Sequence, residues 1–110
     1  QRLTSNPLTI NGDGEQRRDF TYVQDVVHAN ILASESFKVG TGEPINIGSS
    51  DNRSVNDIAA LIGGPTVSRP GVVEPRATLA DISTARRKID WEPTMLLEDW
   101  MPSYKKSIGL

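Results

Sequence analysis

The sequence contains no cysteine and only one histidine among its 110 residues. The absence of cysteine excludes disulfide bonds and thiolate metal sites, and it fits a reducing compartment such as the cytoplasm. A single histidine excludes a metal site built from several imidazoles of one chain. No apolar run approaches the roughly 18 residues of a membrane span, and no signal peptide is visible. We therefore expect a cytoplasmic protein that has no membrane contact and binds no metal.

An excess of basic charge is also missing. Twelve Lys and Arg stand against 14 Asp and Glu, so the formal net charge is −2. This balance argues against nucleic acid as a partner, because general nucleic-acid binders are basic. Hydrophobic residues make up only 36% of the chain and aromatic residues 5%, which predicts a modest core. The length predicts a single domain over residues 1–110, or a piece of one.

In the first half of the chain, short strand patterns surround one helical stripe. The run "LTI" predicts a strand over Leu8–Ile10, and the "NGDG" that follows offers glycines for a turn with positive φ. "DFTYV" predicts a second strand. Apolar residues at helical spacing predict a helix over Asp25–Lys38, with Asp25 as its N-cap. This helix could serve as the crossover between parallel strands. "INIGSS" predicts a buried strand over Ile45–Ser50.

The second half is richer in helices. Ser54 and Asp57 form an approximate capping box for a helix that ends at Gly63. "VSRPGVVEPRATLAD" reads as irregular, Ser83 is placed to cap a short helix, and a last helix is predicted over residues 97–108. The fold class is therefore α/β: a small, helix-rich mixed domain with a few short strands. So few strands make a poor sheet unless something continues it, and the chain looks incomplete.

Three segments in register resemble one family. "GDGEQRRDFTYVQDV" (residues 12–26) carries the pattern G-D-G-x-Q-x-R-D-F-x-Y-V-x-D-V, "INIGSS" follows, and "RPG…E…LADISTARRKIDWEP" comes last. Together they resemble the NAD-dependent epimerase/dehydratase family, the extended short-chain dehydrogenases that act on nucleotide-diphosphate sugars, and UDP-glucose 4-epimerase in particular. The resemblance covers about residues 6–110. It implies the smaller, C-terminal, substrate-binding portion of such an enzyme.

The cofactor and catalytic motifs of that family are not found in this chain. No G-x-x-G-x-x-G fingerprint appears, and "GDGEQ" lies between two predicted strands instead of opening a helix. Neither tyrosine is followed by the lysine that would complete a Tyr-x-x-x-Lys pair, because Val26 follows Tyr22 and Ile108 follows Tyr104 at that spacing. We expect no catalytic residue here and no cofactor bound by this chain alone. NAD is implied for the full-length family enzyme.

The resemblance implies that the first strand and its loop bind the nucleotide. Backbone groups of Leu8, Thr9 and Ile10 would meet the edge of a uracil or thymine. Arg18 would bind the pyrophosphate, because a planar fork of donors suits two oxygens at once. Gly12 would permit the turn that directs this arginine.

A second arginine and an acid would complete the implied site. Arg69, from the R-P-G segment, would join Arg18 at the phosphates, and Glu74 would bind the ribose hydroxyls. In the family the acid comes three residues after the arginine, but that position is Val72 here. Either the loop carries a two-residue insertion or the ribose contact is lost. Arg17 is predicted to be only a solvated neighbour.

These residues also have structural interpretations. Arg18 could be an ordinary surface ion-pair partner, and Thr9 could be only a strand residue. His28 falls on the outer face of the predicted helix, where we expect it to be exposed and without a role. Trp91 and Trp100 are expected to be packing anchors.

Three functional readings remain open. The chain could be a part of a nucleotide-sugar epimerase or dehydratase that is inactive alone, with a Rossmann domain as its partner. It could be a free-standing sugar-nucleotide binding module. It could also be a truncated remnant that only packs against a Rossmann domain. The sequence does not distinguish epimerase from dehydratase or decarboxylase, and the expected apolar surface predicts self-association when the chain is isolated.

Overall fold

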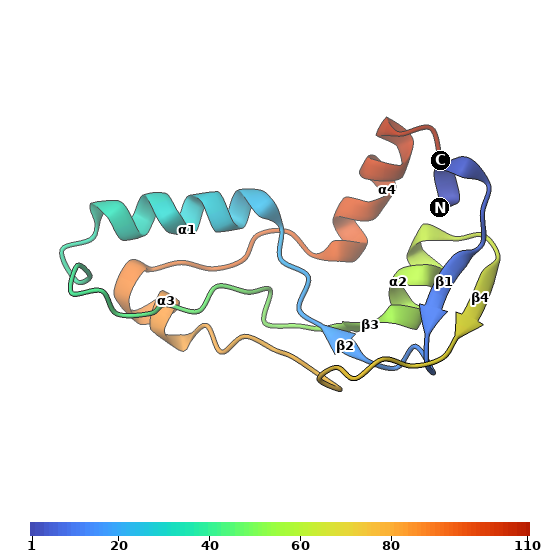
Figure 1. The fold of residues 1–110 in the computed structure, drawn as a ribbon. Coiled ribbons are helices and arrows are strands. Elements are labelled where there is room, and N and C mark those ends of the chain that lie inside the picture. The colour runs from blue at the N-terminus through green and yellow to red at the C-terminus, as the bar shows by residue number, and fades with distance from the viewer. The chain divides into compact units, whose positions relative to one another are not determined.

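The computed structural model describes residues 1–110 and divides them into two compact units. Unit 1 comprises Gln1–Arg18, Asn52–Thr78 and Glu98–Leu110, and unit 2 comprises Asp19–Asp51 and Leu79–Leu97. The elements along the chain (Figure 1) are η1 (Arg2–Thr4), β1 (Leu8–Asn11), β2 (Arg17–Arg18), α1 (Val23–Glu35), β3 (Arg53–Ser54), α2 (Val55–Ile62), β4 (Thr66–Arg69), α3 (Ser83–Ile89) and α4 (Leu97–Ser107). The predicted α/β class with few short strands is confirmed.

Unit 1 is built on two small strand pairs. β1 and β4 run parallel, with Leu8 opposite Thr66 and Asn11 opposite Arg69. β2 and β3 pair antiparallel. The strand predicted at Leu8–Ile10 is thus confirmed as β1, one residue longer. β4 includes the first three residues of the segment that was predicted to be irregular, so that prediction is wrong for Val67–Arg69, whose backbone completes the parallel ladder with β1. The remainder of the segment forms no helix and no further strand, as predicted.

Helix α2 covers the β1–β4 pair (Figure 1). Leu8 and Ile10 point from β1 into a small core with Ala59 of α2. The predicted capping box is present: the Ser54 hydroxyl accepts a hydrogen bond from the Asp57 amide, and the Asp57 carboxylate accepts one from the Ser54 amide. The helix that packs on this parallel pair is therefore α2, and not the helix predicted near residues 25–38.

Unit 2 has a core of α1 and α3 with the chain that follows α3. Ala29, Ile82, Ala85, Ile89 and Trp91 form its buried cluster. The indole N–H of Trp91, which has no exposed surface, donates to the backbone carbonyl of Asp25 at 2.9 Å. Its predicted role as a packing anchor is confirmed.

Two strands predicted in unit 2 are not formed. Asp19–Tyr22 is held by side-chain bonds: the Asp19 carboxylate accepts hydrogen bonds from the amide and hydroxyl of Ser49 and from the amide of Ala80. The segment 45–50 pairs with no strand, although Ile45 and Ile47 pack against the core. An apolar run signals burial, and burial alone does not supply a ladder partner.

The boundaries of the first long helix, α1, differ from the predicted ones. α1 begins at Val23, and Asp25 lies within its first turn, where the buried carboxylate accepts hydrogen bonds from the amide and hydroxyl of Thr94. It therefore joins two segments of unit 2 and is not an N-cap. α1 ends at Glu35, three residues earlier than predicted, and the Ser36 hydroxyl donates to the Lys88 carbonyl. His28 is exposed, as predicted.

Two further helix predictions can be compared with the structure. Ser83 is the first residue of α3, whose N-cap is Ile82, so its predicted capping role is wrong; the Ser83 amide instead donates to the Asp81 carboxylate at 2.9 Å. The last predicted helix is confirmed as α4, with Met101 buried. Trp100 stacks on Tyr104 in this helix, with ring centroids 4.3 Å apart. None of the helices is long and apolar enough to cross a membrane.

Candidate functional site

Arg18 and Glu74, which the sequence proposed for two parts of one ligand, contact each other. Arg18 ends β2, and Glu74 lies in the loop after β4. Arg18 Nη2 lies 2.5 Å from Glu74 Oε2, and Arg18 Nη1 donates to the backbone carbonyl of Arg17 at 2.7 Å. The two charged side chains are about 30% exposed, at 28% and 31%. The ion pair therefore lies at the surface with both partners accessible to a ligand.

Gln16 extends this pair into the interior of unit 1. Its Nε2 donates to Glu74 Oε1 at 3.1 Å and to the Asn11 carbonyl at 3.0 Å. Its Oε1 is buried and accepts no hydrogen bond. A buried acceptor without a partner costs about 1–3 kcal/mol, so its presence calls for an explanation. Sequence reasoning missed Gln16, although the signal was available: it stands two residues before Arg18 in the quoted motif.

Gln16 and Glu74 border a hollow of about 300 Å³ in unit 1. Gly12 has φ +66°, and a Cβ added there would lie 3.4 Å from the Cα of Gly71, so the turn after β1 and the loop after β4 approach closely. Positive φ at this point favours glycine. The hollow is lined by Asn11, Gly12, Asp13, Gln16, Gly71, Val72, Glu74 and Arg76.

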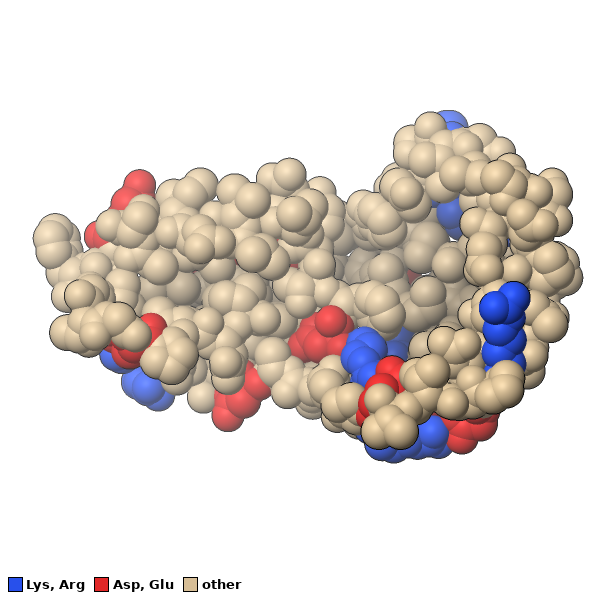
Figure 2. Space-filling view, viewed as in Figure 1, with Lys and Arg blue, Asp and Glu red and all other residues tan.

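A second ion pair stands at the rim of this hollow. Two guanidinium nitrogens of Arg76 lie 2.8 and 2.9 Å from the two carboxylate oxygens of Asp13. The hydrogen bond from Arg76, assisted by one from the Glu15 amide, lowers the pKa of Asp13 to about 2. Acidic and basic side chains consequently lie side by side on the visible face of unit 1 (Figure 2), without a surface of one sign.

Thr9 holds a carboxamide group in the structure. Its amide donates to Gln1 Oε1 at 3.1 Å, and Gln1 Nε2 donates to Thr9 Oγ1 at 2.8 Å. The side chains of Leu8 and Ile10 are buried in the core, which leaves only their backbones for any ligand contact. The exposed edge of β1 at Thr9 thus presents a donor and an acceptor that bind an amide together.

Arg69 lies at the end of β4, opposite Asn11, and its carbonyl accepts a hydrogen bond from the Gly12 amide at 2.8 Å. Its side chain is exposed and forms no ion pair. The structure therefore brings the backbone of Arg69 to the turn that lines the hollow, and leaves its guanidinium available.

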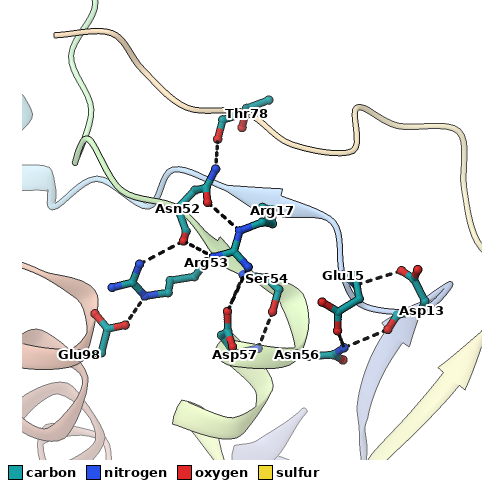
Figure 3. A network of polar contacts seen from close by, with 10 residues as sticks. All are labelled: Asp13, Glu15, Arg17, Asn52, Arg53, Ser54, Asn56, Asp57, Thr78 and Glu98. Atoms are coloured by element: carbon teal, nitrogen blue, oxygen red, sulfur yellow. Dashed lines mark hydrogen bonds and ion pairs between the residues drawn. The ribbon is translucent and has the colours of Figure 1, made fainter.

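Arg17 is not the solvated neighbour that the sequence predicted. Its Nε donates to Asn52 Oδ1 and its Nη2 to the Asn52 carbonyl, both at 2.7 Å, and Nη1 lies 3.7 Å from the Asp57 carboxylate. Figure 3 shows this arginine within a polar network that joins β2, β3 and the first turn of α2. Arg17 therefore holds unit 1 together, while its neighbour Arg18 faces Glu74.

The structure shows neither the glycine turn of a dinucleotide site nor a cluster of metal ligands. The glycine turn after β1 leads to β2 and not to the N-terminus of a helix, which is where a dinucleotide pyrophosphate would bind. The residues present therefore do not fit NAD. No group of three or more His, Asp or Glu residues is arranged to hold a metal ion.

The class of protein follows from comparison with known sequences. Residues 1–48 match the model of the NAD dependent epimerase/dehydratase family. The sequence and the fold relate this chain to that family, and the resemblance predicted from its motifs is confirmed.

Three of the similar proteins are named for UDP-sugars. An uncharacterized UDP-glucose epimerase of Bacillus subtilis is 37% identical over 90% of this chain and 33% of its own length. UDP-glucuronic acid decarboxylase 1 of Arabidopsis thaliana is 28% identical over 93% of this chain and 24% of its own. A crystal structure of UDP-glucuronic acid 4-epimerase from Bacillus cereus, in complex with UDP-glucuronic acid and NAD, superposes with TM-score 0.84 and 36% identity, over 99% of this chain and 37% of that one. The chain thus spans about a quarter to a third of the length of these curated relatives.

Proposed function

We propose that this chain supplies the nucleotide-sugar site of an epimerase or decarboxylase of this family, and that its ligand is a UDP-sugar. The observation that carries the proposal is the cluster of Arg18, Glu74 and Gln16 beside the hollow after β1. Relatives named for UDP-sugars support the ligand class. NAD and the hydride chemistry belong to a Rossmann domain that acts as partner to this portion.

The diphosphate takes the place of Glu74 at Arg18. In the structure Arg18 forms an ion pair with the carboxylate of Glu74. A phosphate group also offers two oxygens to a guanidinium, and it carries more negative charge than a carboxylate. Bidentate hydrogen bonds between a guanidinium and a phosphate are among the stronger ones in proteins. Arg69, whose guanidinium is unpaired, provides the second cation.

The ribose is then held by Glu74 and Gln16. Once Arg18 turns to the phosphate, Glu74 Oε2 is free to accept a hydrogen bond from a hydroxyl. The Gln16 Nε2 already donates to Glu74 Oε1 and to the Asn11 carbonyl, which leaves Gln16 Oε1 as a second acceptor without a partner. Two acceptors side by side suit the two hydroxyl donors of a vicinal diol. This arrangement gives Glu74 the ribose role in spite of its shifted position in the sequence.

The base lies along β1. Gln1 donates to Thr9 with an amide N–H and accepts from Thr9 with a carbonyl oxygen. The edge of uracil presents the same two groups. We propose that uracil replaces the Gln1 carboxamide at Thr9.

Calorimetry with UDP on the 110-residue chain tests the proposal. Arg18→Ala should weaken binding about ten- to a hundredfold, because a charge-assisted hydrogen bond to an anion contributes about 1.5–3 kcal/mol. Arg18→Lys should restore only part of the affinity, since a point charge cannot replace the fork. Arg87→Ala is the matched control, an exposed arginine of α3 outside the cluster. If Arg18→Ala and Arg87→Ala bind UDP equally well, the assignment is wrong.

A further inference from the structure

We propose that Val72 contacts the apolar face of the nucleoside and so makes this hollow bind nucleotides more tightly than ligands without a nucleoside. This inference rests on the proposed function. Val72 carries the only apolar side chain among the residues that line the hollow. The other lining residues are glycine, amide or charged residues. They can bind the edges of a ligand, but they offer nothing to the flat or saturated face of a ring.

The position of Val72 is fixed at both ends. On one side Gly71 touches Gly12, with a separation of 3.5 Å between a Cβ built on Gly71 and the Gly12 Cα. On the other side Glu74 is held by Arg18 and Gln16. The two valines between these anchors therefore have little freedom in where they stand.

The two valines differ in their surroundings. Val72 lines the hollow and is 60% exposed, whereas Val73 is fully exposed and is not among the lining residues. When a ligand covers an apolar side chain that was exposed to water, the removal of that surface from water makes binding more favourable. Val73, which does not line the hollow, would gain nothing from the same ligand.

A nucleoside has the matching chemistry. A ribose or a pyrimidine carries its hydrogen-bonding groups at the edge and C–H or π surface on its faces. With Gln16 and Glu74 at the edge, the face is left for Val72. Inorganic diphosphate has no such face, so Val72 should distinguish UDP from a bare diphosphate.

The test compares adjacent threonine substitutions that keep the branched shape of valine. Affinities for UDP and for inorganic pyrophosphate are measured by calorimetry on the wild-type chain, Val72→Thr and Val73→Thr. We expect Val72→Thr to weaken UDP binding about three- to tenfold, in line with the loss of one buried methyl contact. Its affinity for pyrophosphate should change by less than about twofold, and Val73→Thr should match the wild type for both ligands.

The outcomes separate this inference from the function on which it rests. If the wild type binds UDP but Val72→Thr and Val73→Thr are equal, the Val72 contact is wrong and the nucleotide site stands. If Val72→Thr weakens the binding of UDP and of pyrophosphate by the same factor, the residue acts on the phosphates and the inferred contact with the nucleoside is wrong. If the wild type binds pyrophosphate but gains nothing from the nucleoside of UDP, both proposals fall. A thermal melt of each variant verifies that this exposed position leaves the fold intact.

Discussion

Arg17 and Arg18 are neighbours in the sequence and in β2, yet their side chains have opposite roles. Successive residues of a strand point to opposite faces. One face carries Arg17 to Asn52 and Asp57, where its hydrogen bonds join β2 to the start of α2. The other carries Arg18 to Glu74. A pair of arginines in a sequence looks like one basic spot, but the pleat of the strand divides it into a structural cation and a ligand-facing cation.

Arg17→Ala should therefore lower the stability of the chain. It removes two short charge-assisted hydrogen bonds to Asn52, and we expect a loss of about 1–3 kcal/mol in the free energy of unfolding. Urea denaturation followed by circular dichroism measures this value. Arg87→Ala, at an exposed site with one long contact to Thr84, should change stability by less than about 0.5 kcal/mol. Equal midpoints for the two variants would show that the contacts of Arg17 with Asn52 contribute nothing.

At the scale of elements, local signals predicted the structure well and long-range partners were not predictable. The capping box at Ser54 and Asp57 is encoded within four residues, and it formed as predicted. β4 depends on pairing with β1, more than fifty residues away, and "VSRPGVVEPR" contains no signal for that partner. The missing strand at 45–50 shows the converse, because its apolar pattern reports packing against the core and nothing about pairing.

The same distinction applies to the candidate site. Arg18, Gly12 and Glu74 were proposed from the resemblance of the motifs, and the structure brings all three to one part of unit 1. Gln16 was not found because a glutamine has no charge to attract notice, and its importance depends on a burial that only the folded chain reveals.

Gly48 tests how the segment after α1 is held in unit 2. A Cβ at this position would lie 2.4 Å from the Cβ of Ala80 and 2.5 Å from Oδ2 of Asp19. Gly48→Ala should therefore displace the carboxylate that binds the Ser49 amide and cost about 1–3 kcal/mol, as overpacking usually does. The measurement is again urea denaturation.

Gly71→Ala is the matched control for that substitution. Its φ is not positive, and its added Cβ would find ordinary contact distance, 3.5 Å from Gly12 Cα. Its stability should stay close to that of the wild type. If Gly48→Ala is equally well tolerated, the close contact between Gly48, Asp19 and Ala80 does not constrain unit 2.

At the scale of the whole molecule, one helix presents apolar residues to water on its outer side. Val23, Val27 and Ile31 recur every four residues along α1 and are 62%, 46% and 49% exposed. Residues four apart share one face of a helix. The segment at 45–50 of the same unit pairs with no strand. An exposed apolar helix face and an unpaired extended segment are each typical of a surface that another polypeptide covers.

The isolated chain should consequently self-associate through this surface. We expect light scattering to give an average mass that rises with concentration, and the double variant Val27→Lys/Ile31→Lys to reduce that rise, because burying two ammonium groups opposes association. Ser103→Lys adds a charge at an exposed polar position of another helix, α4, and should leave the self-association unchanged. A wild-type mass that stays monomeric over the whole concentration range would contradict the prediction.

The ion pair between Arg18 and Glu74 also has a kinetic consequence. Because Arg18 is already neutralised by its own carboxylate, and Asp13 and Arg76 cancel each other beside it, Arg69 is the one charge named at this site that attracts an approaching anion at long range. Electrostatic steering accelerates association only where charge of one sign dominates a surface. Encounter with a nucleotide should therefore be slow and nearly independent of ionic strength, at about 10⁵–10⁷ M⁻¹s⁻¹. The protein would recognise its ligand by exchanging the carboxylate of Glu74 for a phosphate at Arg18. Salt would therefore change the dissociation rate of the ligand more than its association rate.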